Sequence, residues 1–212
     1  RAVIETVEGV QRIRGLAGSG KTVVLALKAA YLHAQHPEWK IAVTFNTRSL
    51  KGQLRQLINT FYIEQTSEEP DWDNLHILHA WGAPGGGERT GMYYIFCGTN
   101  NLEYLDFLSA KNRFGSTDPF GVACRKALEE ATDPRPMYDA VLVDEAQDFS
   151  PAFLKLCYEM LREPKRLVYA YDELQNLRLQ SLPSPEEIFG VDEHGVPNAV
   201  SYTHLRAHET RE

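Results

Sequence analysis

The chain has 212 residues, of which 43% are hydrophobic and 24% are charged, a composition that is ordinary for a compact globular protein. Its net charge of −7 argues against a protein that coats nucleic acid through bulk electrostatics, although it leaves room for a local basic groove. No apolar run approaches the roughly 18 residues of a membrane span, and no signal-peptide pattern is present, so the sequence predicts a cytoplasmic protein without membrane contact.

Short apolar runs alternate with stretches of helical periodicity along most of the chain. The expected strands cover residues 11–14, 41–45, 76–78, 141–143 and 167–170. The expected helices between them cover residues 22–35, 48–62 and 151–161. Because strands that alternate with helices pair in parallel and are covered on both sides, this pattern predicts an α/β fold with a parallel sheet sandwiched by helices.

Residues 83–136 interrupt this alternation and are interpreted as a mixed insertion, with helices expected near residues 102–109 and 120–132. Both ends of the chain are expected to be artificial. Residue 1 is not a methionine and stands close to the first motif, which predicts that an upstream segment is missing. Residues 1–199 are therefore expected to form the domain, and residues 200–212 to be a non-native, adapter-derived tail; a native polar tail is the alternative.

Residues 15–22, with the sequence GLAGSGKT, fit the pattern of a phosphate-binding loop between a strand and a helix. The residues expected to line the phosphates are Gly15, Ala17, Gly18, Ser19, Gly20, Lys21 and Thr22. Lys21 is expected to reach the β- and γ-phosphates of ATP, and the Thr22 hydroxyl to bind Mg²⁺. The alternative is a glycine-rich turn that only caps a helix.

Two further motifs place polar residues directly after buried strands. In the segment VLVDEAQD, Asp144 is expected to hold Mg²⁺ and Glu145 to accept a proton from the attacking water. Thirty residues on, Gln175 is expected to contact the γ-phosphate or that water. Taken alone, each motif is equally typical of a solvated surface turn. The phosphate-loop pattern upstream favours the functional interpretation.

Together these motifs resemble those of the UvrD/Rep-like superfamily 1 helicases, over about residues 12–177. The resemblance implies a RecA-like P-loop NTPase domain that binds ATP and Mg²⁺ and moves on single-stranded nucleic acid; DNA is favoured over RNA, but the residues leave that choice open. It also implies strand contacts by Thr44, Phe45 and Asn46, in the segment TFNT. His79 and Trp81 are weaker candidates for the same groove, with a surface histidine and a core tryptophan as the alternatives.

The chain departs from the family pattern in several places. Tyr171 stands where glycine is usual, and the second RecA-like domain, a partner in the intact motor, is absent. The chain is therefore expected to bind ATP–Mg²⁺ weakly and to hydrolyse it slowly. Two rival functions remain open: an ATP-dependent nucleic-acid-sensing switch or nuclease partner that does not unwind, and a P-loop small-molecule kinase.

Overall fold

The computed structural model describes residues 3–5, 8–18, 20–172 and 182–205. Its centre is a six-stranded sheet in the order β3-β2-β4-β5-β1-β6, in which each neighbouring pair is parallel. The strands are β1 (Val10–Gly15), β2 (Ile41–Phe45), β3 (Leu75–His79), β4 (Tyr138–Val143), β5 (Leu161–Asp172) and β6 (Ala199–Leu205). The predicted α/β fold with a parallel sheet is therefore confirmed.

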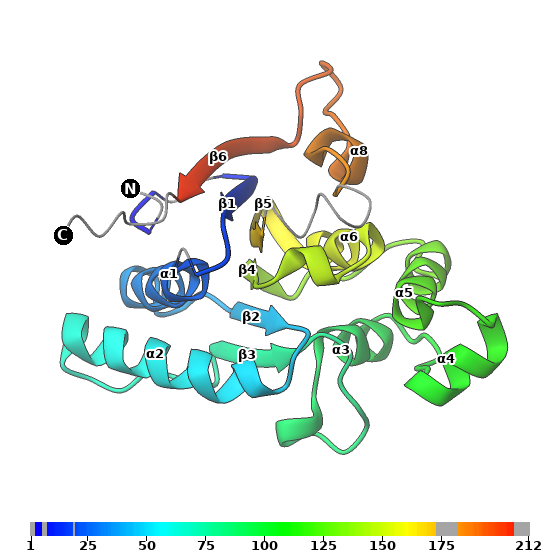
Figure 1. The fold of residues 1–212 in the computed structure, drawn as a ribbon, viewed down its shortest axis with the longest axis horizontal. Helices are drawn as coiled ribbons and strands as arrows, with labels where there is room; N and C mark the ends of the chain where they lie inside the picture. The colour runs from blue at the N-terminus through cyan, green and yellow to red at the C-terminus, as the bar shows by residue number, and fades with distance from the viewer. Residues whose placement is uncertain (1–2, 6–7, 19, 173–181, 206–212) are drawn as a thin grey trace.

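Helices cover both faces of the sheet, as Figure 1 shows. One face carries α1 (Lys21–Gln35) and α2 (Ser49–Thr66), which pack against each other. The other face carries α3 (Met92–Thr99), α5 (Pro119–Glu130), α6 (Pro151–Glu159) and the short α8 (Pro185–Phe189). Helix α4 (Phe107–Phe114) packs on α5 at the periphery. Within the described residues, no helix is both long and apolar enough to cross a membrane.

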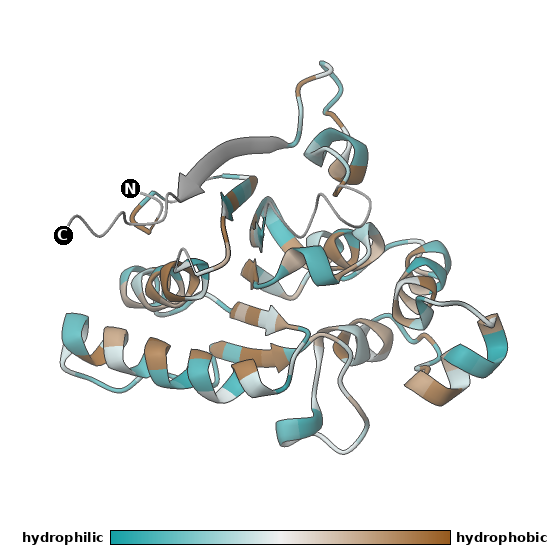
Figure 2. Ribbon diagram, in the orientation of Figure 1, coloured by the Kyte–Doolittle hydropathy of each residue, from teal (hydrophilic) through white to brown (hydrophobic). Residues whose placement is uncertain are grey.

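The alternation of side chains along β4 explains why the sheet has two cores. Val141 and Val143 belong to the core beneath α3, α5 and α6, whereas Ala140 and Leu142 belong to the core beneath α1 and α2. Successive residues of a strand point to opposite faces, so a strand covered on both sides must be apolar throughout. Figure 2 shows this hydrophobic character along the central strands.

The insertion between β3 and β4 differs from its prediction. The expected helix at residues 102–109 is wrong over its first half, because residues 102–106 form a loop and α4 begins only at Phe107. Asp106 caps α4, its carboxylate accepting a hydrogen bond from Ser109 N at 2.7 Å. The aromatic stretch at residues 93–96 lies in α3, a helix that the sequence did not predict. The helix expected at residues 151–161 ends at Glu159, and Leu161 already begins β5.

Strand β6 is a further element that the sequence did not predict. Residues 200–205, set aside as a tail of foreign origin, form most of β6 and pair in parallel with β1. The sheet thus gains an edge strand. Residues 206–212 lie outside the described part of the chain.

Candidate functional site

The candidate site lies where the strands end. In a parallel sheet all carboxyl ends meet at one edge, and open α/β sheets bind ligands there. This edge brings together Gly15 from β1, Phe45 from β2 and His79 from β3. Asp144 follows β4 at the same edge, and Asp172 ends β5. Motifs spread over more than 150 positions of the sequence therefore share one surface.

The loop after β1 leads directly into α1, as its sequence predicts. Gly18 and Gly20 have φ angles of 74° and 80°, in the left-handed region that glycine adopts without strain. Apart from the chain neighbours, a Cβ atom at either position would meet nothing within 4 Å, so the side-chain direction at both glycines is open. Ala17 is exposed, and Ser19 lies outside the described residues. A loop of this form at a helix N-terminus fits an anion.

Lys21 is held beneath this loop. Its side chain is only 6% exposed, and its Nζ donates hydrogen bonds to the carbonyl oxygens of Gly15 at 3.2 Å and Leu16 at 2.9 Å. An ammonium group has three donors, so these two bonds position it and leave one donor for a further acceptor. The arrangement keeps the lysine charge within the loop.

Thr22 and Asp144 meet across the sheet edge although 122 positions separate them. The Thr22 hydroxyl donates to Asp144 Oδ2 at 2.7 Å, and the backbone N–H of Glu145 donates to Asp144 Oδ1 at 2.9 Å. The Asp144 side chain is fully buried. Burial raises the pKa of this carboxyl, the hydrogen bond from Thr22 opposes the rise, and the neighbouring charge of Glu145 adds to it.

Gln147 connects the two acidic strand ends, a role that the sequence analysis missed. Its side-chain amide donates to Glu145 Oε2, and its Oε1 accepts a hydrogen bond from Asp172 N at 3.0 Å. Glu145 itself has a φ of 49°, which is unusual for a residue with a side chain. The only sequence hint was the position of Gln147 two residues after Glu145. Gln175, which follows Asp172, lies outside the described residues.

The donor set at this edge fits a magnesium ion. Thr22 and Asp144 present a hydroxyl and a carboxylate, and Mg²⁺ in nucleotide sites prefers one or two such protein oxygens together with phosphate and water. Over the part of the chain that the structure describes, no group of three or more His, Cys, Asp or Glu residues forms a dedicated metal cage.

The residues expected to contact nucleic acid differ in their exposure. The side chains of Thr44 and Phe45 are fully buried, and Thr44 Oγ1 has no hydrogen-bond partner among the described residues. Thr44 instead contributes its backbone, because its carbonyl oxygen accepts the N–H of Asp144 at 3.0 Å. Asn46 is exposed, and its carbonyl oxygen lies 2.5 Å from Nε2 of His79. A direct contact through the Thr44 hydroxyl, which the resemblance implied, does not fit this burial.

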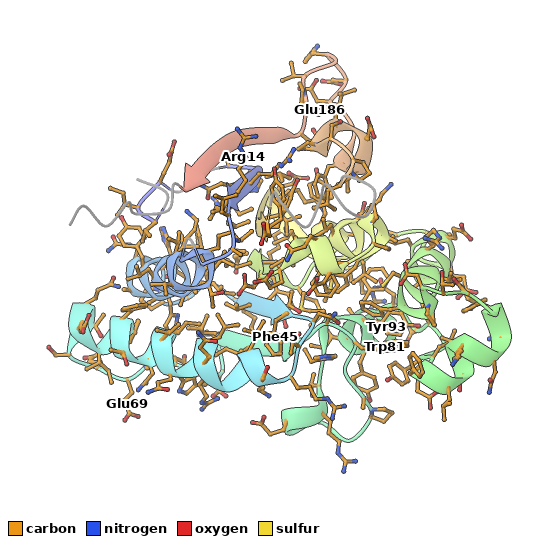
Figure 3. The ribbon with its side chains drawn as sticks, in the orientation of Figure 1. Arg14, Phe45, Glu69, Trp81, Tyr93 and Glu186 are labelled. Carbon is orange, nitrogen blue, oxygen red and sulfur yellow. The ribbon has the colours of Figure 1, made fainter. Side chains whose placement is uncertain are left out.

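Trp81 combines the two roles that the sequence left open. Its indole Nε1 donates to Leu105 O at 2.8 Å, and its ring stacks on Phe120 with centroids 4.9 Å apart, so much of it belongs to the core. Figure 3 shows Trp81 next to Tyr93, which it meets edge-on, and Phe45 nearby at the end of β2. The rest of the Trp81 side chain lines a pocket.

This pocket has a volume of about 580 Å³ and opens beside the ends of β2 and β3. Phe45, His79 and Trp81 line it together with the basic residues Arg48 and Lys51. Burial lowers the pKa of His79, the hydrogen bond to the Asn46 carbonyl opposes this, and the positive charges of Arg48 and Lys51 lower it further. Sequence reasoning did not single out Arg48, which directly follows the TFNT segment, or Lys51, which lies on the first turn of α2.

No protein-family model matches the chain, and no curated protein matches it in sequence.

Proposed function

We propose that this chain binds ATP with Mg²⁺ at loop 15–22 and hydrolyses it, as the first RecA-like P-loop domain of a superfamily 1 motor that acts on single-stranded nucleic acid. The observation that carries the proposal is the hydrogen bond between Thr22 Oγ1 and Asp144 Oδ2. It joins the end of the glycine-rich loop to the acid after β4, which is the pairing that a nucleotide-bound magnesium ion requires.

Each group at the sheet edge then has a defined task. The backbone of loop 15–22 and the N-terminus of α1 bind the phosphates, and the Lys21 ammonium neutralises the β- and γ-phosphate charge. Thr22 and Asp144 would hold Mg²⁺, which when bound would supply positive charge that offsets the charge of the phosphates. Glu145 accepts the proton of the attacking water, and Gln147 holds its carboxylate in place.

Hydrolysis by this chain alone is expected to be slow. In a two-domain motor, an arginine from the second RecA-like domain stabilises the charge of the transition state, and such a residue contributes about 10³- to 10⁵-fold in rate. Binding, by contrast, depends mainly on groups that this chain contains. ATP binding and ATP turnover are therefore separate tests.

The first test is binding of a fluorescent ATP analogue to this chain, with Mg²⁺ or with EDTA. We expect Mg²⁺-dependent binding that Lys21→Ala abolishes. Lys40→Ala is the matched control, because Lys40 is exposed and directly precedes β2 at the opposite, amino edge of the sheet. An equal loss of analogue binding in Lys21→Ala and Lys40→Ala, or binding that does not depend on Mg²⁺, would contradict the proposal.

The second test is ATP turnover with and without single-stranded DNA or RNA, in a protein that also carries the second motor domain. Stimulation that Glu145→Gln removes while ATP still binds is the expected result. ATP turnover that does not change with nucleic acid but rises when a small-molecule phosphate acceptor is added would favour the alternative function of a P-loop small-molecule kinase.

A further inference from the structure

The pocket beside β2 and β3 has a second wall, and that wall comes from the insertion at residues 83–136. Opposite the residues already described, Arg89, Tyr104 and Phe107 line the same cavity. None of them belongs to a motif that the sequence analysis used. The insertion therefore does not merely extend the fold, since it completes a cavity whose other half is built from the strand ends.

Hydrogen bonds fix this second wall to the strand ends. Tyr104 donates its hydroxyl to Gly82 O at 2.6 Å, and Leu105 O receives the indole N–H of Trp81 at 2.8 Å. Burial raises the pKa of Tyr104 to about 12, so its hydroxyl keeps the proton that this bond needs. The loop that carries Arg89 is closed by a bond from Ala83 N to Arg89 O at 2.6 Å. The wall is thus held in position before any ligand arrives.

At its base this loop depends on two glycines. Gly82 and Gly91 pass so close that a Cβ atom built on Gly82 would lie 2.3 Å from Gly91 N. Only two residues without side chains permit that approach. The close contact brings the two ends of the loop together and keeps Arg89 at the rim of the pocket.

The chemistry of the pocket combines aromatic surface with positive charge. Phe107 is 52% exposed and meets Trp81 in a T-shaped contact with centroids 5.9 Å apart, and the Lys111 ammonium lies 5.8 Å from the centroid of its ring. Arg48, Lys51 and Arg89 place three cations around the same cavity, in a chain whose net charge is −7. Aromatic faces with nearby cations are the groups that bind unpaired bases and their phosphates.

One carboxylate competes for these cations. Glu88 lies 2.5 Å from Lys51 Nζ, but it is highly exposed, and exposed ion pairs contribute at most about 1 kcal/mol. A phosphate group can therefore replace it at Lys51. The carboxylate of Asp106, also in the lining, already accepts the N–H of Ser109 as the cap of α4.

We infer that the insertion closes a nucleobase pocket, in which Phe107 and Tyr104 pack against one unpaired base of a single strand and Arg89 binds an adjoining phosphate. This inference rests on the proposed function for the presence of a strand. It goes further by giving the insertion a direct role in binding that strand. Because a paired base cannot enter such a cavity, it also predicts selection against duplexes.

The test is fluorescence anisotropy of a labelled 12-nucleotide dT strand with this chain. Phe107→Ala is expected to weaken binding about 5- to 100-fold, the usual effect of removing one stacking ring. The matched control is Leu108→Ala, because Leu108 neighbours Phe107 on α4 and is 65% exposed but does not line the pocket. For Arg89→Ala the control is Arg125→Ala, on a different surface.

Two further arms separate base contacts from phosphate contacts. An abasic strand of the same length should bind the wild-type protein more weakly than dT and should respond to Arg89→Ala but not to Phe107→Ala. A duplex of the same length should compete poorly. A matching rU strand adds the 2′-hydroxyl and removes the C5 methyl group of the base, and the same dependence on Phe107 with rU supports the pocket equally. Thermal denaturation of each variant checks that it remains folded.

The outcomes distinguish this inference from the function on which it rests. Binding that falls in Arg48→Ala but is unchanged in Phe107→Ala and Arg89→Ala would overturn the role of the insertion and leave the proposed function intact. A wild-type chain that binds neither dT nor rU would overturn both the pocket and the nucleic-acid part of the proposal. ATP binding, measured separately, would be unaffected by either result.

Discussion

Replacing Asp144 by asparagine should stabilise the nucleotide-free protein while removing its response to magnesium. The Asp144 carboxyl group is fully buried, and within the described part of the chain it accepts hydrogen bonds from the Thr22 hydroxyl and the backbone N–H of Glu145. An asparagine can keep both contacts, since its oxygen accepts from Glu145 N and its amide donates to the Thr22 oxygen. Because its surroundings raise the pKa of the Asp144 carboxyl, the ionised form is less stable in the folded protein than in water, and a neutral amide avoids that cost.

We expect a gain on the order of 1 kcal/mol, because the Lys21 ammonium already offsets part of the cost. For a domain of this size the gain corresponds to roughly 2 to 4 °C in Tm. Burial raises the folded-state pKa of Asp144, so the folded protein takes up this proton more readily than the unfolded chain. Wild-type stability therefore declines relative to Asp144→Asn as pH rises through that pKa, and the advantage of the variant is largest at neutral pH.

The assay is thermal unfolding followed by circular dichroism, in EDTA and then with Mg²⁺ and ATP. The wild-type protein should gain stability from Mg²⁺–ATP, and Asp144→Asn should begin at a higher Tm and gain little. Asp139→Asn is the control on the same strand, because Asp139 pairs with Arg162 at 3.1 Å near the amino end of β4. It should keep the full response to Mg²⁺–ATP. An Asp144→Asn protein that melts lower in EDTA, or that responds like the wild type to Mg²⁺–ATP, would refute this reasoning.

Three further predictions concern residues other than Thr22 and Asp144. Gln147→Ala should leave ATP binding unchanged and reduce nucleic-acid-stimulated ATP turnover at least tenfold, because the Glu145 side chain loses its link through Gln147 to Asp172 N. Unchanged ATP turnover would exclude the positioning role of Gln147. Burial lowers the pKa of Lys28 to about 8, so the folded protein loses this proton at a lower pH than the unfolded chain does. The free energy of unfolding in urea should therefore rise with pH above 8, by up to about 3 kcal/mol relative to Lys28→Met. Parallel pH profiles of the two proteins would contradict this. Binding of the dT strand should weaken with salt at a log–log slope of about −2, since three pocket cations displace counterions from a single strand; a slope near zero would argue against phosphate contacts.

The sheet was predictable because its strands are apolar on both faces. Val141 and Val143 face one core and Leu142 the other, and a continuous apolar run is the sequence consequence of that burial. The insertion was less predictable for a physical reason. Leu105 is buried and its apolar neighbours suggested a helix, but its carbonyl oxygen is used by Trp81, which lies 24 positions away. Local periodicity carries no information about such a partner.

The candidate site, like the fold, was predictable from the sequence only in part. The approach of Thr22 to Asp144 followed from motif order, because parallel strands place both at one edge. The burial of Thr44 did not follow, since a residue at a strand end is exposed or covered according to the helices around it. Arg89 and Phe107 also had no local pattern that assigned them to a site. Arg89 reaches the pocket from the loop between β3 and α3, and Phe107 from the start of α4.

The hydrogen bond from Asp144 N to Thr44 O, at 3.0 Å, has a mechanical consequence. It ties the backbone of Asp144, the proposed magnesium ligand, to the strand whose next residue, Phe45, lines the pocket. Under the proposed function, a displacement of the Asp144 backbone on nucleotide binding would reach Phe45 through this hydrogen bond and one peptide unit. The nucleotide site and the pocket would then be mechanically coupled over a short distance.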